Sequence, residues 1–133
     1  MCEVIDKLAL VHCRNGRMLM VRTRGRDKFY NPGGKRIGDE SDIDALCREI
    51  REELNVEIIP ESVKPYGVFT RPADNKPDGV MVQMTCYTAE FRGDPAPGAE
   101  IEELAWLNMS DWDRISSVGE LIFTDAYKKG LIS

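Results

Sequence analysis

Residues 41 to 55 are the part of the sequence that most restricts what this chain can fold into. Ser41 followed by Asp44 is a capping-box pattern, which predicts a helix that starts just after Ser41. At about 100° per residue, this helix has one apolar side and one acidic side. The apolar side contains Ile43, Leu46, Cys47, Ile50 and Leu54, and the acidic side contains Glu49, Glu52 and Glu53. The pattern therefore predicts a helix that packs on a core and gathers three carboxylates on another side.

The three neighbouring carboxylates repel one another, and an ordinary surface helix gains nothing from them. One interpretation is a solvated acidic face. The other is a bound divalent cation, because carboxylate oxygens are the ligands that hard cations such as Mg²⁺ prefer. A zinc site is not indicated, since the chain has a single histidine, His12, and its 4 cysteines include no C-x-x-C pair.

The same stretch resembles the Nudix box, G-x5-E-x7-R-E-U-x-E-E-x-G-U, in which U is a bulky aliphatic residue. The match runs in register from Gly34 to Val56. The matching residues are Gly34, Glu40, Arg48, Glu49, Ile50, Glu52, Glu53 and Val56. Two positions depart from the pattern. Asn55 replaces the last glycine, and we expect it to end the helix in a left-handed conformation, which asparagine tolerates well. Asp39 stands where a small residue is usual, which affects the pose of Glu40.

The resemblance implies a role for each matching residue. Glu49, Glu52 and Glu53 would be metal ligands, Glu40 a further ligand or a support for the others, and Arg48 the residue that orients a glutamate. Some Nudix proteins carry another catalytic glutamate shortly before a strand tryptophan. Glu100, which lies before Trp106, is the nearest match, with Glu102, Glu103 and a solvated strand edge as alternatives. The Gly33-Gly34-Lys35 run would let the backbone approach a phosphate, because glycine has no Cβ.

The remaining sequence predicts strands around this helix. Val4–Cys13 is apolar on both faces and predicts a buried central strand, and Asn15-Gly16 predicts a hairpin turn. A second capping box, Ser117 with Glu120, predicts a final helix that continues to Tyr127 and stops at Gly130. The other expected strands are 17–23, 63–70, 80–91 and 101–107. These elements predict one α/β domain over residues 1–133 with a mixed sheet, in agreement with the α/β/α sandwich that the resemblance implies.

Composition narrows the range of partners. The net charge of −5 argues against a general nucleic-acid binder, and no apolar run is long enough to span a membrane. We expect a cytoplasmic protein with reduced cysteines. Basic residues are nevertheless dense between Arg14 and Arg36, a stretch in which Asp27 is the only acid. This run would attract a polyphosphate, and the sequence leaves the oligomeric state open, a homodimer included.

The resemblance implies a hydrolase that uses Mg²⁺ or Mn²⁺ to cleave a nucleoside diphosphate linked to another group. The compact chain resembles the house-cleaning members that cut nucleoside triphosphates. An ADP-ribose or nucleotide-sugar pyrophosphatase is the alternative, since Pro72 lies at the spacing from the box that marks ADP-ribose pyrophosphatases. A domain that senses nucleotides without cleaving them is a further alternative, although such domains commonly lose box carboxylates. Trp106, Phe29, Tyr30 and Phe69 are candidates for stacking on a base, although a place in the core is the favoured interpretation for each.

Overall fold

The computed structural model of the protein describes residues 3–73 and 76–133. Its larger sheet has the strand order β4-β1-β7-β6. The long strand β1 pairs with β7 in parallel and with β4 in antiparallel orientation, so this sheet is mixed. The central position expected for the strand over Val4–Cys13 is confirmed, but the strand ends at Leu10 and only its last three residues are fully buried. The four strands are β1 (Glu3–Leu10), β4 (Gly33–Gly34), β6 (Lys64–Pro72) and β7 (Val80–Thr88).

A second sheet has the order β2-β3-β9. Asn15 and Gly16 connect β2 to β3 with φ angles of 53° and 77°, the left-handed pair that a tight two-residue hairpin needs. A short two-stranded pairing of β5 with β8 completes the strands. The bounds are β2 (Cys13–Arg14), β3 (Arg17–Thr23), β5 (Glu57–Ile58), β8 (Phe91–Arg92) and β9 (Ile101–Leu107).

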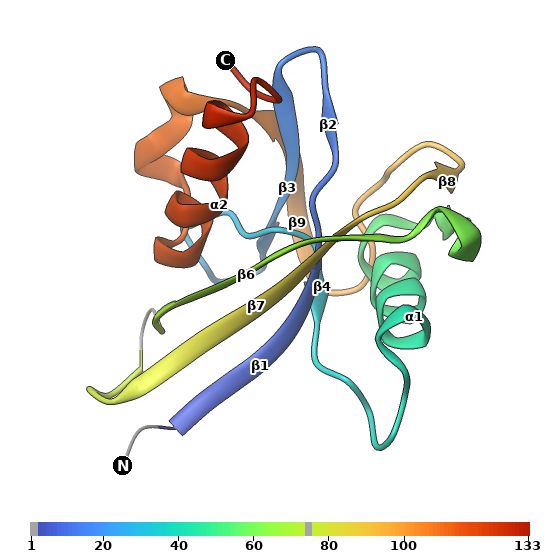
Figure 1. The fold of residues 1–133 in the computed structure, drawn as a ribbon, viewed down its shortest axis with the longest axis horizontal. Helices are drawn as coiled ribbons and strands as arrows, with labels where there is room; N and C mark the ends of the chain where they lie inside the picture. The colour runs from blue at the N-terminus through green and yellow to red at the C-terminus, as the bar shows by residue number, and fades with distance from the viewer. Residues whose placement is uncertain (1–2, 74–75) are drawn as a thin grey trace.

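Two helices lie on opposite sides of the strands (Figure 1). The helix α1 (Asp42–Leu54) packs on one side and α2 (Ser117–Lys128) on the other, and two short 3₁₀ segments, η1 (Pro60–Ser62) and η2 (Met109–Arg114), lie in the connections. Consecutive residues of β1 face opposite ways, so Ala9 belongs to the core under α2 and Leu10 to the core under α1. The α/β sandwich with a mixed sheet is confirmed.

The ends of α1 agree with the sequence. The Ser41 hydroxyl accepts a hydrogen bond from the Asp44 backbone N–H, and Asn55 ends the helix with a φ of 57°. Leu46, Ile50 and Leu54 are fully buried. Ile43, on the same side of α1, is 39% exposed, so the apolar side is not buried in the first turn of the helix.

Other boundaries also differ from the prediction. The cap of α2 is Ser116, which accepts from the Gly119 N–H, so the capping pattern lies one residue before Ser117. The strand expected over 80–91 is interrupted after Thr88, and its last part forms β8 with a different partner. Strand β6 continues beyond Thr70 to Pro72 because its edge position leaves the proline nitrogen without a required partner.

The described part of the chain contains no helix that is both long enough and apolar enough to cross a membrane. Cys13, Cys47 and Cys86 are free thiols, as expected, and Cys2 lies outside the described residues.

Candidate active site

The two glycines of β4 are required by the close packing of β4 on its neighbours. A Cβ atom on Gly34 would lie 2.4 Å from Oε2 of Glu49, and one on Gly33 would lie 1.9 Å from the carbonyl oxygen of Leu8. The Gly33 N–H donates a 2.9 Å hydrogen bond to Oε1 of Glu53. The backbone that the sequence assigned to a phosphate therefore contacts the helix carboxylates directly, and Lys35 follows with an exposed side chain.

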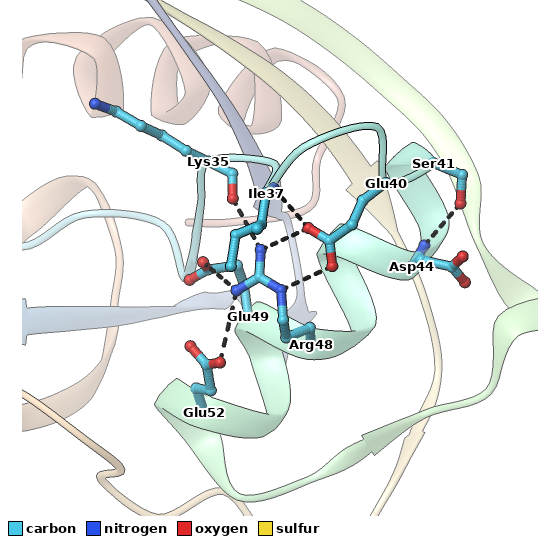
Figure 2. Close-up of polar contacts among 8 residues, drawn as sticks. All are labelled: Lys35, Ile37, Glu40, Ser41, Asp44, Arg48, Glu49 and Glu52. Atoms are coloured by element: carbon cyan, nitrogen blue, oxygen red, sulfur yellow. Dashed lines mark hydrogen bonds and ion pairs between the residues drawn. The ribbon is translucent and has the colours of Figure 1, made fainter.

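Arg48 organises the acidic side of α1 (Figure 2). Its Nε and Nη2 donate to the two carboxylate oxygens of Glu40, both at 2.9 Å, and Nη2 also donates to the Lys35 carbonyl. Its Nη1 donates to Oε1 of Glu49 at 2.8 Å and lies 3.6 Å from Oε1 of Glu52. One guanidinium therefore joins the loop after β4 to two of the helix carboxylates, as a planar fork of donors allows.

Glu40 is held on both of its oxygens, since the Ile37 N–H donates to Oε1 at 2.7 Å in addition to the bonds from Arg48. The hydrogen bonds from Arg48 lower the pKa of Glu40 to about 2, and the Ile37 N–H contributes to the same shift. Of the two roles that the sequence leaves open for Glu40, the geometry favours support of Arg48.

Glu49, Glu52 and Glu53 project from α1 toward a shared cavity of about 320 Å³. Burial raises the pKa of Glu53 to about 7, and the negative charges of Glu49 and Glu52 add to this effect. The Gly33 N–H and Lys7 oppose it. A partly buried carboxylate beside two like charges is the arrangement that a cation would relieve.

Glu100 reaches the same cavity from the loop before β9. Its φ of 63° is unusual for a residue with a side chain. The loop lies directly on the C-terminal end of α1. The Gly98 N–H donates to the carbonyl of Glu53 at 2.9 Å and the Ala99 N–H to that of Glu52 at 3.0 Å. These bonds satisfy carbonyls that the end of a helix leaves free, and they bring Glu100 beside the helix glutamates.

Glu102 and Glu103 lie elsewhere. Both pair with Arg22, at 3.7 Å and 3.2 Å, along the surface of the second sheet. Sequence reasoning missed Gly98, although one signal for it exists. A glycine in the loop before β9 allows close backbone approach, and a Cβ there would lie 1.8 Å from the carbonyl oxygen of Glu52.

The carboxylates suit Mg²⁺ or Mn²⁺ in their chemistry, although within residues 3–73 and 76–133 no three acidic, histidine or cysteine side chains form a ready-made set of ligands. The reason is visible in the contacts, because Arg48 holds Glu49 and the Gly33 N–H holds Glu53. Glu49, Glu52 and Glu53 would hold the cation, with Glu100 facing them across the cavity. The four glutamates that line this one cavity support the fit, because carboxylate oxygens are the ligands that hard cations prefer.

A second cavity of about 270 Å³ lies next to the first and shares Thr23 and Glu53 with it. Of the four stacking candidates, only Tyr30 lines this cavity. The other three are engaged elsewhere. Phe29 is 3% exposed in the core, Phe69 packs on Tyr66, and Trp106 contacts His12 and Arg14.

Several residues of the basic run are committed to other contacts. Arg22 pairs with Glu102 and Glu103, Arg36 with Asp6 and Asp42, and Lys28 donates to the Asp113 carbonyl. Of this run, only Arg26 lines the second cavity. Only a few side chains of the run therefore remain to attract a polyphosphate, and not the whole run as the sequence suggested.

Comparison with known proteins agrees with the geometry. The model of the NUDIX domain family matches residues 7–121. The fold is similar to that of a NUDIX hydrolase from Nitrosomonas europaea, with a TM-score of 0.74 and 18% identity over 98% of this chain and 92% of that one. It is also similar to a MutT NUDIX hydrolase from Burkholderia pseudomallei, with a TM-score of 0.71 and 23% identity over 92% of this chain and 97% of that one.

A third similar structure is the E. coli ORF135 protein, with a TM-score of 0.71 and 23% identity over 96% of this chain and 91% of that one. At these identities the solved structures establish the fold alone, and no curated protein matches the sequence. The family match covers most of the chain, and it coincides with the helix, the glycine loop and the carboxylate cavity described above. The protein therefore belongs to the Nudix family, and it is a hydrolase of phosphoric anhydrides.

Proposed function

We propose that this Nudix hydrolase cleaves a nucleoside triphosphate within its phosphate chain, releasing the nucleoside monophosphate and pyrophosphate. The observation that carries the proposal is the pair of adjoining cavities. One is lined by four glutamates, and the other is large enough for part of a nucleoside and contains Tyr30. Such a pair suits a substrate with a phosphate chain at one end and a nucleoside at the other.

In this proposal Glu49, Glu52 and Glu53 hold the divalent cation, which when bound would polarise the phosphate and lower the pKa of a water molecule. Arg48 keeps Glu49 in place through the 2.8 Å contact and is itself anchored by Glu40. Glu100, across the cavity, accepts the proton of the attacking water. Phosphoryl transfer asks little else of a protein beyond positioning and charge.

An ADP-ribose or nucleotide-sugar substrate is the second candidate, and one contact favours it. The carbonyl of Pro72 accepts a 3.1 Å hydrogen bond from the hydroxyl of Ser117. Ser117 lines the second cavity together with Ala73. Pro72 therefore contacts a residue of the cavity that would hold the part of the substrate beyond the phosphates. A sensing domain without catalysis is disfavoured, because every box carboxylate is retained.

The test compares a nucleoside triphosphate with ADP-ribose in ¹⁸O-labelled water, using magnesium and purified protein. We expect pyrophosphate from the triphosphate and little turnover of ADP-ribose. Glu52→Gln and Glu100→Gln should lower turnover by roughly a hundredfold or more, because each removes an anionic oxygen from the cavity. Glu102→Gln is the matched control, since Glu102 pairs with Arg22 outside the cavity.

Efficient cleavage of ADP-ribose with inert triphosphates would select the second candidate. Near-normal turnover in Glu52→Gln at saturating magnesium would contradict the ligand assignment. A loss in Glu102→Gln equal to that in Glu100→Gln would remove the proton-accepting role from Glu100.

A further inference from the structure

The second cavity is unusually basic for a site that would receive an uncharged nucleobase. Lys7 from β1, Arg26 from the loop after β3 and Lys76 from the loop before β7 all line it. Among the residues that the structure describes, Glu53 is the only acidic one in its lining. A hydrophobic pocket for a base usually needs a few polar groups for orientation, and three cations exceed that need.

None of these three side chains forms a hydrogen bond or an ion pair with an acid in the described ranges. Lys7 is half-buried, and burial together with the charges of Lys35, Arg26 and Lys76 lowers its pKa. The Lys35 side chain extends away from the Arg48 cluster (Figure 2), so its amine is not part of the ion pairs around α1. Glu53 offsets part of this positive charge. The remaining repulsion between like charges is destabilising, and a bound anion would reverse that effect.

This basic cavity is distinct from the carboxylate cavity, where the phosphates of the cleaved linkage would bind. Glu53 lies in the wall between the two cavities, so an anion on the basic side occupies a different position from the metal-bound phosphates. The first turn of α2, through Ser117 and Val118, also lines the basic cavity. The positive end of the helix dipole therefore adds to the three side chains.

We propose that this basic cavity, lined by Lys7, Arg26 and Lys76, binds a phosphate group other than the phosphates of the cleaved linkage. The inference rests on the proposed function and makes its substrate class narrower. The preferred substrate is a nucleotide that carries a phosphate on a ribose hydroxyl in addition to its 5′ phosphate chain. Lys7 and Arg26 hold that ribose phosphate, and the 5′ chain extends past Glu53 to the carboxylate cavity.

The test measures binding without metal, so that it does not depend on hydrolysis. Two matched pairs differ by one ribose phosphate, namely ATP with 3′-phospho-ATP and ADP-ribose with 2′-phospho-ADP-ribose. By calorimetry in EDTA, the wild type should bind the phosphorylated member of at least one pair about tenfold more tightly, as charge-assisted hydrogen bonds to phosphate allow. Lys7→Gln and Arg26→Gln should each reduce that ratio at least about threefold.

Arg17→Gln is the matched control, because Arg17 is an exposed arginine of the same basic run at the opposite end of β3 from Thr23. It should leave the ratio unchanged. Equal affinities within both pairs would overturn the proposal, and so would a wild-type ratio that persists in both Lys7→Gln and Arg26→Gln. An equal loss of the affinity ratio in Arg17→Gln would mean that general surface charge causes the difference, and this result would also overturn the proposal.

Adding magnesium to the same samples separates this inference from the proposed function. Hydrolysis of the triphosphates that is abolished in Glu52→Gln supports both. A preserved binding ratio without hydrolysis of any triphosphate or diphosphate compound would contradict the proposed function and leave the phosphate site standing.

Discussion

At the scale of single residues, the site depends on a few positions where the backbone has no room for another side chain. Gly34 is the clearest case, because Glu49 occupies the space where its Cβ would lie. Arg48 then holds that glutamate from the other side at 2.8 Å. The position of Glu49 therefore depends both on the absence of a Cβ atom at Gly34 and on the hydrogen bond from Arg48. Its side chain is only 15% exposed.

Gly34→Ala should therefore displace the Glu49 carboxylate, since the new Cβ would lie 2.4 Å from Oε2. We expect turnover to fall by about tenfold to a hundredfold, because a shift near 1 Å in a catalytic group has effects of that size. Steady-state kinetics and a thermal melt would check the change. Gly38→Ala is the control, because its Cβ would meet nothing within 4 Å, although its φ of +59° makes alanine slightly strained. Equal activity losses in both variants would contradict the explanation.

At the scale of elements, α1 is fixed at both ends by different means. Its beginning is closed locally, by the Ser41 hydroxyl on the Asp44 N–H. Its end is closed by the left-handed Asn55 and by the loop that carries Gly98 and Ala99. Asn55 also donates from Nδ2 to the carbonyls of Ala96 and Pro97, at 3.2 Å and 3.3 Å. The helix end and the loop that delivers Glu100 are thus one connected unit.

Substitutions at Asn55 test this unit. Asn55→Gly keeps the left-handed φ but removes the two bonds to the loop, so these effects oppose each other and we expect a change in the free energy of unfolding within about 1 kcal/mol. Asn55→Val should cost about 1 kcal/mol or more, because a β-branched side chain resists positive φ. Urea unfolding measures both. A valine variant as stable as the wild type would show that α1 ends in some other way.

At the scale of the whole molecule, the fold places two cavities of opposite charge on either side of Glu53. The carboxylate cavity lies between α1 and the loop before β9, and the basic cavity lies between the large sheet and the first turn of α2. Helices on both sides of the strands make this possible (Figure 1). The stability of the molecule should then depend on what neutralises the carboxylates.

Magnesium should raise the melting temperature of the wild type, because a ligand that binds only the folded state stabilises it by mass action. Glu53→Gln keeps an acceptor for the Gly33 N–H but removes the charge whose ionisation burial disfavours. At about pH 8, where Glu53 is mostly ionised, the metal-free variant should melt about 2–4 °C higher than the metal-free wild type. It should also gain less from magnesium. Identical magnesium-induced shifts in the two proteins would place the ion elsewhere.

The sequence by itself determined those features that depend on neighbours along the chain. The 3.6-residue period, the Ser41 cap and the left-handed Asn55 are local, and all three are present as predicted. The hairpin at Asn15-Gly16 is local in the same sense. The predicted start of α2 was wrong by one residue because Ser116 and Ser117 can each cap a helix. Only the packing of α2 decides between the two serines.

The tertiary structure alone decided how distant residues meet. It separated Glu100 from Glu102 and Glu103, because Glu100 lines the same cavity as the glutamates of α1 and the other two lie beside Arg22. This separation depends on contacts between residues far apart in the chain. It also gathered Lys7, Arg26 and Lys76 from three separate segments into one cavity. No period or motif in the sequence predicts that these residues lie close together. Proximity across a sheet is set by strand order and register and not by spacing along the sequence.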